Sequence, residues 1–224
     1  MEPSHYRRGL TLIELLVVLA IIVIIALVVL TSQSNFNKTL ILTNTAYDVA
    51  LTLRSAETYG LGNRVSTTIA NAGYGLHFTR ATPGVITLFA DTYPAPSVTS
   101  CHPIPVGSSV APDSRPGNCV YDASQGEKVT DYALGNGVTV SDFCAYTPNT
   151  QSWSCATSGD TTLTELDIIF ERPNPDPFMS INGLYSTAAP VTQACLTLSS
   201  TQGGARFISV EASGEIIAAA ASCP

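Results

Sequence analysis

Arg7-Arg8-Gly9-Leu10-Thr11-Leu12-Ile13-Glu14-Leu15 opens a stretch of sequence that stays apolar as far as Leu30. The run from Leu15 to Leu30 contains no charged or polar side chain. As a helix this run would be about 24 Å long, which is a little less than the ~30 Å hydrocarbon core of a bilayer. A helix that crosses the bilayer must therefore recruit its N-terminal flank, and this brings Glu14 into or just inside the apolar layer.

Glu14 is the ionisable residue of this predicted span. A lone acid in a membrane helix costs about 3 kcal/mol on insertion scales, whereas each large apolar residue returns about 0.3 to 0.6 kcal/mol. The segment is therefore predicted to insert together with Glu14. An ionisable residue in a membrane span indicates a functional role, and its charge requires a partner group.

The residues Gly9-Leu10-Thr11-Leu12-Ile13-Glu14-Leu15 resemble the processing site of type IV prepilins and type II secretion pseudopilins. The resemblance implies that a membrane peptidase cuts after Gly9 and that the new N-terminal residue, Leu10, is methylated. It also implies that the hydrophobic helix stays on the mature protein. Thr11 and Glu14 are the expected assembly residues, with Glu14 paired to the N-terminal amine of a neighbouring subunit.

Two other interpretations explain less of this segment. A secretory signal peptide is cut after its apolar core at a small-x-small site, and the sequence at residues 31–35 matches such a site poorly. A generic single-pass anchor explains the hydrophobicity but neither Gly9 nor Glu14.

The charge distribution bears on topology and on partners. The chain has 10 basic and 17 acidic residues, a formal net charge of −7. An acidic domain repels phosphate backbones, which disfavours non-specific nucleic-acid binding. Arg7 and Arg8 precede the span and predict a cytoplasmic N-terminus. The expected protein is thus a single-pass inner (cytoplasmic) membrane protein with a periplasmic or extracellular C-terminal domain.

Six cysteines follow the predicted span, and an even number in an exported domain predicts disulfides. Their connectivity is open, and pairing between sequence neighbours is the simplest expectation. A zinc site is the competing interpretation, but no C-x-x-C pair is present. The expected pairs are Cys101–Cys119, Cys144–Cys155 and Cys195–Cys223.

One continuous helix is predicted at the N-terminal end, because no proline or glycine occurs between Leu10 and Tyr59. Past Thr31 its pattern becomes amphipathic, and Gly60 and Gly62 are expected to end it. The apolar residues of this half recur at steps of four and three and predict the face that packs on the domain. They are Leu42, Ala46, Val49, Leu53, Ala56 and Gly60.

The rest of the chain predicts short strands and turns. The fold class is therefore α+β, a long N-terminal helix packed on an antiparallel β-sheet domain. Irregular loops are expected at Tyr93–Gly126 and between Cys144 and Cys155, and Asn174-Pro175-Asp176-Pro177 is expected to stiffen a turn. The expected strands are Val65–Ile69, Gly75–Thr79, Val85–Phe89, Val138–Val140, Leu166–Phe170, Ala194–Leu198, Phe207–Val210 and Ile216–Ala219.

A second resemblance covers much of the domain. Gly73–Phe78, Val85–Asp91, Ile168–Pro173 and Ile208–Ile216 are similar to segments of H-type minor pseudopilins and FimT-like minor pilins. The resemblance implies the same fold class. The predicted division of the chain is a cleaved leader at 1–9, a transmembrane and filament-core helix half at 10–31, an amphipathic helix half at 32–62 and a globular β domain at 63–224.

The sequence predicts no enzyme, no cofactor and no metal site. The histidines His5, His77 and His102 lie apart, and no activated-serine signature appears. No phosphate-binding P-loop is present, and the acidic loop residues lack EF-hand spacing.

The expected function is a structural subunit, minor in stoichiometry, of a type IV pilus or type II secretion pseudopilus. Its expected partners are other pilin or pseudopilin subunits, the prepilin peptidase, and membrane lipid before assembly. One alternative is a DNA-binding minor pilin of natural transformation, although Arg206 is the last basic residue of the chain. Another is a pilus-tip adhesin that exposes the Tyr93–Gly126 loop.

Overall fold

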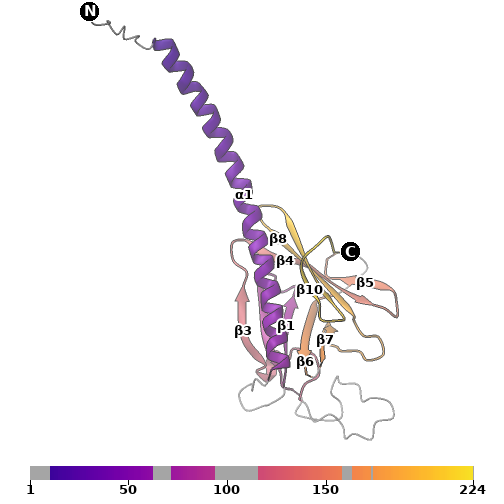
Figure 1. Cartoon of the computed structure of the whole chain (residues 1–224). Coiled ribbons are helices and arrows are strands. Elements are labelled where there is room, and N and C mark those ends of the chain that lie inside the picture. Colours follow the sequence, from indigo (N-terminus) through magenta and orange to yellow (C-terminus); the bar gives the residue numbers. More distant parts are fainter. Residues whose placement is uncertain (1–10, 63–71, 94–115, 158–162, 173, 224) are drawn as a thin grey trace, which may run out of the picture. The chain divides into compact units, whose positions relative to one another are not determined.

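The computed structural model describes residues 11–62, 72–93, 116–157, 163–172 and 174–223. The chain divides into two compact units, Met1–Leu40 and Ile41–Pro224. The helix α1 (Leu12–Leu61) is continuous over fifty residues (Figure 1). The predicted unbroken helix is confirmed, and it ends where its glycines were expected to end it. The Gly62 N–H donates to the Thr58 carbonyl at 3.0 Å and closes the last turn.

Two five-stranded antiparallel sheets make up most of the second unit. One sheet has the order β3-β2-β1-β6-β7 and the other the order β10-β9-β8-β4-β5. A short 3-10 helix, η1 (Ala123–Gln125), precedes β3. The strands are β1 (Gly73–Thr79), β2 (Val85–Asp91), β3 (Lys128–Ala133), β4 (Val138–Thr147), β5 (Ser152–Cys155), β6 (Glu165–Glu171), β7 (Asn174–Ile181), β8 (Gln193–Ser200), β9 (Ala205–Glu211) and β10 (Ile216–Ala220).

A single large core unites the C-terminal part of α1 with both sheets. All six residues of the predicted packing face of the helix are buried. Alternate residues of the strands fill the rest, such as Leu76 and Phe78 of β1 and Leu196 and Leu198 of β8. The side chains between them point to the other face of each sheet, as the two-residue period of a strand requires. The α+β class predicted from the sequence is confirmed.

Several predicted elements of the sheets are confirmed, including the strands β1, β2 and β6. The three expected C-terminal strands are also confirmed, and they form a meander because β8, β9 and β10 are neighbours in one sheet. The expected strand Val65–Ile69 lies outside the described residues.

Two local predictions were wrong. Asn174–Pro177 does not form a turn but begins β7, and Glu171 pairs with Asn174 across a turn that precedes it. The strand tolerates two prolines because β7 is an edge strand, where a missing N–H donor need not break the sheet. The stretch between Cys144 and Cys155 is not a polar loop but a hairpin, in which β5 pairs with the end of β4.

Candidate functional site

The described part of the N-terminal segment begins with a helix cap. Thr11 immediately precedes α1, and its side-chain Oγ1 accepts a hydrogen bond from the Glu14 N–H at 3.3 Å. The Thr11 carbonyl also accepts bonds from Glu14 and Leu15 at 3.1 and 3.2 Å. Thr11 and Glu14 thus occupy the first and last positions of a T-x-x-E capping-box sequence. The carboxylate in the first turn also favours the helix because of its dipole. Gly9 and Leu10 lie outside the described residues.

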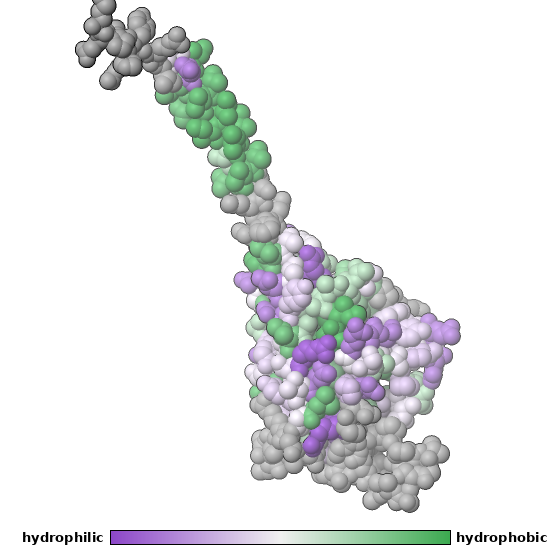
Figure 2. All heavy atoms as spheres, viewed as in Figure 1, coloured by the Kyte–Doolittle hydropathy of each residue, from purple (hydrophilic) through white to green (hydrophobic). Residues whose placement is uncertain are grey.

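The helix that follows exposes a continuous series of large apolar side chains, which cover the face seen in Figure 2. Leu12–Leu30 is long and apolar enough to cross a membrane, with a mean hydropathy of 3.5, and none of it is buried within the structure. Exposed fractions of its large side chains run from 82% at Leu12 to 47% at Val29. So large an apolar surface is not stable in water and marks contact with lipid or other protein.

Residues 4–30 match the family model of the prokaryotic N-terminal methylation motif. The chain carries a type IV prepilin signal. The motif is typical of membrane-anchored, pilin-like or pseudopilin-like proteins that prepilin peptidase processes. This confirms the resemblance seen at Gly9–Leu15. No curated protein and no solved structure matches the chain.

The described cysteines form disulfides in the second unit. Two of the three expected bonds join described residues and are present, Cys144–Cys155 and Cys195–Cys223. Cys119 is also disulfide-bonded, while Cys101 lies outside the described residues. The first bond joins directly opposed residues of β4 and β5, and the second ties the C-terminal end of the chain to β8.

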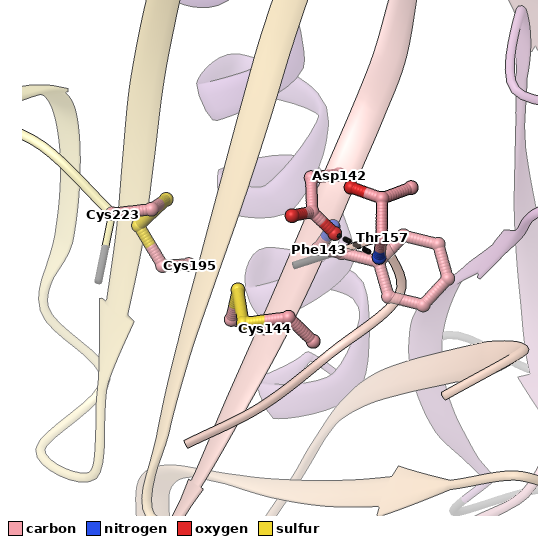
Figure 3. Close-up of a disulfide and its surroundings, with 7 residues drawn as sticks. Asp142, Phe143, Cys144, Thr157, Cys195 and Cys223 are labelled. Atoms are coloured by element: carbon pink, nitrogen blue, oxygen red, sulfur yellow. Dashed lines mark hydrogen bonds between the residues drawn. A yellow bond between two sulfur atoms is a disulfide. The ribbon is translucent and has the colours of Figure 1, made fainter. Parts of the chain in front are cut away.

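Asp142 lies beside the Cys144–Cys155 bond, and its carboxylate and the two sulfurs come within 4.8 Å of one another. Sulfur atoms joined in a disulfide are not thiolates and therefore do not offer the ligands that zinc selects. The carboxylate is also occupied, because Asp142 Oδ1 accepts bonds from the N–H groups of Phe143 and Thr157, each at 2.9 Å (Figure 3). This group is a structural cap on the β4–β5 hairpin.

Buried carboxylates hold the segment that follows residue 115 against β2. Asp91, only 3% exposed, accepts bonds from the N–H groups of Asn118 and Cys119 at 3.0 and 2.7 Å. Burial raises the pKa of Asp91 well above its ordinary value, and the neighbouring charge of Glu127 raises it further. Gly117 fits here because a Cβ atom would lie 2.6 Å from the Asp91 carboxyl group.

Glu127 is the second of these carboxylates. Its Oε1 accepts bonds from the N–H groups of Thr92 and Tyr93, both at 2.8 Å, and its Oε2 accepts one from Asp122 at 2.7 Å. Burial raises the pKa of Glu127 to about 7, although the three backbone donors act in the opposite direction. Both acids accept hydrogen bonds from backbone N–H groups, so they anchor this loop.

His77 lies in β1 and is half-buried, and its Nδ1 is 2.6 Å from Asp167 Oδ1. Ser180 donates to the other oxygen of Asp167 at 3.1 Å, as does the Tyr121 N–H at 3.2 Å. In a catalytic triad the serine would bond the histidine and the acid would orient the ring. Here the serine bonds the acid, so the described residues of this group form a structural network between β1, β6 and β7.

Two features of these sites were not predicted. The capping role of Thr11 was readable from the T-x-x-E spacing, which the prepilin resemblance also contains. No sequence pattern predicts that Asp91 and Glu127 anchor this loop, because the acids and the N–H groups they bind lie up to 35 residues apart in the chain.

Proposed function

We propose that this protein is a structural subunit, minor in stoichiometry, of a type IV pilus or type II secretion pseudopilus. The observation that carries the proposal is the methylation motif at residues 4–30 on a helix whose Leu12–Leu30 segment has no buried residue. Such a segment is suited to lie first in lipid and then against the helices of other subunits, since both surroundings remove its apolar surface from water.

The proposal assigns a role to each part of the chain. Residues 1–9 are the cleaved leader, 10–31 the membrane and filament-core half of the helix, 32–62 the amphipathic half, and 63–224 the exported β domain. Arg7 and Arg8 keep the N-terminus in the cytoplasm, and the anchor lies in the inner membrane. The disulfides of the second unit support export, because such bonds persist in oxidising compartments.

The intact mass and N-terminal sequence of the protein, isolated from membranes that contain an active prepilin peptidase, test the proposal. The expected mature chain starts at Leu10 and carries one added methyl group. A start at Met1 would leave an ordinary membrane-anchored exported domain. A start beyond Leu30 would make the protein a free secreted domain and would exclude a filament subunit.

Glu14 is the residue proposed to pair with the N-terminal amine of the next subunit. In an apolar filament core this pairing offsets the cost of the buried charge. Glu14→Ala is expected to leave membrane insertion intact and to abolish incorporation into a filament, measured by the fraction of subunit in sheared filaments. Glu57→Ala, which removes an exposed ion pair with Arg54 on the same helix, is the matched control and should incorporate normally. Normal incorporation of Glu14→Ala would contradict the pairing.

The structure gives the DNA-binding alternative no specific support. Arg206, the last basic residue of the chain, donates from Nε to Thr43 Oγ1 at 3.1 Å and from Nη1 to its neighbour's carbonyl at 2.9 Å. Its guanidinium therefore joins β9 to α1. The loop expected to serve an adhesin falls largely outside the described residues.

A further inference from the structure

Three cysteines stand in one row across the β5-β4-β8 part of the second sheet. Cys155 of β5 lies directly opposite Cys144 of β4, and Cys144 lies directly opposite Cys195 of β8. Side chains directly opposed on antiparallel strands point to the same face, with Cβ atoms about 4.5–5.5 Å apart. Cys144 therefore has a sulfur-bearing neighbour on each side, although it is bonded to only one of them.

The fourth sulfur joins this row from the C-terminal end of the chain. Cys223 is bonded to Cys195, and Figure 3 shows that bond beside Cys144. Trp153 and Phe207 pack on the row, and Cys144, Cys155 and Cys195 are all buried. Cys223 is only half-buried. Because exchange requires a thiolate to reach a sulfur, Cys223 is the point at which an external thiol gains access.

We propose that this cysteine row is a thiol–disulfide exchange site. A dithiol reductant attacks Cys223 and reduces the Cys195–Cys223 bond. The freed Cys195 thiolate then attacks Cys144, displaces Cys155 and forms a Cys144–Cys195 bond. Directly opposed residues of antiparallel strands generally have α-carbons about 4.5 or 5.5 Å apart, which is a separation that disulfides span. The new Cys144–Cys195 bond thus forms without moving β4 away from β8.

The exchange consists of three successive displacements at sulfur. One thiolate of the reductant attacks Sγ of Cys223, which forms a mixed disulfide and releases the Cys195 thiolate. The second thiol of the reductant then displaces Cys223, so the reductant leaves as a disulfide and Cys223 takes a proton. Cys195 attacks Sγ of Cys144, which breaks the Cys144–Cys155 bond and releases the Cys155 thiolate, protonated by water. Two electrons enter the protein, and two disulfides become one.

The two states hold different parts of the fold. Before exchange, the bonds secure the β4–β5 hairpin and the C-terminal end of the chain. After exchange, the remaining bond joins neighbouring central strands, and both the hairpin and the C-terminal end are released. Reduction at the accessible sulfur of Cys223 therefore removes the disulfides that hold the β4–β5 hairpin and the C-terminal end, while a disulfide still links β4 to β8.

Two serine variants of the full-length protein in detergent micelles test the proposal from opposite sides. Cys223→Ser frees Cys195, and Cys155→Ser frees Cys144. After acid quenching and alkylation, non-reducing peptide mass spectrometry should find the same Cys144–Cys195 peptide in both variants. The displaced thiol should appear on Cys155 in the first variant and on Cys223 in the second. Thiols that stay on Cys195 and on Cys144 would overturn the proposal.

Cys119→Ser is the matched control, because Cys119 packs in a separate cluster with Phe89 and Ile169. It should leave both described disulfides unchanged. A Cys144–Cys195 peptide in this control would indicate general scrambling and would also overturn the proposal.

The wild-type chain provides a test that does not depend on a variant folding. Limiting dithiothreitol is added to the full-length protein in detergent, and thiols are labelled over time. The expected products are thiols on Cys223 and Cys155 together with the Cys144–Cys195 peptide. Equal labelling of Cys223 and Cys195 without that peptide would show simple reduction and exclude the exchange.

Discussion

At the scale of single residues, the backbone of the helix lies close to the first sheet at Gly60. A Cβ atom there would lie 1.9 Å from the Phe170 carbonyl oxygen of β6. Gly60→Ala must push α1 away from β6, because a backbone oxygen in a central strand cannot turn aside. We expect a loss of about 1–3 kcal/mol in the free energy of unfolding, measured by urea unfolding of the full-length chain in detergent with the fluorescence of Trp153.

Gly84 provides the control for this substitution. A Cβ atom at Gly84 would meet nothing within 4 Å. Gly84→Ala should therefore change the unfolding free energy by less than about 0.5 kcal/mol. Equal losses for the two variants would contradict the close approach at Gly60.

Glu127 predicts how the stability of the second unit depends on pH. Its pKa is raised to about 7 by burial, whereas an unfolded chain restores the ordinary value of about 4.3. At a pH between these two pKa values, Glu127 is protonated in the folded state and ionised in the unfolded state. The free energy of unfolding therefore falls as pH rises from 5 to 8. One proton sets a slope of no more than about 1.4 kcal/mol per pH unit. Asp91, with its raised pKa, acts in the same direction.

Urea unfolding at a series of pH values measures this slope. Glu127→Gln removes the titrating group and should flatten the fall between pH 6 and 8. Asp131→Asn is the control, since Asp131 is exposed and hydrogen bonds from Thr87 and Lys128 lower its pKa. An unchanged slope in Glu127→Gln would show that the fall comes from other groups.

At the scale of elements, the amphipathic part of α1 presents one face to the core and another to the outside. Leu53 is fully buried in the core, and Leu51, two residues earlier, is 63% exposed. Leu53→Ala should lower the free energy of unfolding by about 2–5 kcal/mol through lost burial and a cavity. Leu51→Ala should change it by less than about 0.5 kcal/mol, and circular dichroism at 222 nm during urea unfolding separates the two. Similar losses would contradict the assigned packing face.

The elements predicted from the sequence are those whose signal is local. The helix followed from an apolar run without proline or glycine, and its buried face followed from steps of three and four. The C-terminal meander followed from short β-branched runs divided by glycine turns. β3 was missed because all six of its residues are exposed, so no alternation marks it. β7 was misjudged because its prolines disfavour a strand unless the sheet order makes it an edge, and sheet order is a long-range property.

The same division holds for the candidate sites. The prepilin signal is a contiguous motif and was readable in full. The sequence left several disulfide connectivities open. It could not predict the cysteine row, because the row depends on the register between β4 and β8. The anchors Asp91 and Glu127 depend on a fold that brings backbone N–H groups to acids distant in the chain.

At the scale of the whole molecule, the two compact units differ in what they require from their surroundings. Leu12–Leu30 has no residue buried within the structure. The unit from Ile41 onward contains the helix face and both sheets of the core. The first unit therefore needs lipid or protein around it, while the second has the buried apolar surface of a self-sufficient domain.

This difference predicts that a chain starting at Lys38 folds without its membrane segment. The full-length protein should float with lipid vesicles, because the sixteen Leu, Ile and Val residues of Leu12–Leu30, at about 0.3–0.6 kcal/mol each, outweigh the cost of Glu14. The shortened chain should stay in the aqueous fraction and keep an unfolding free energy within about 1 kcal/mol of the full-length value, since every helix residue of the core is retained. Vesicle flotation measures the first property and urea unfolding the second. A shortened chain that floats, or that unfolds without a cooperative transition, would show that the second unit depends on the first.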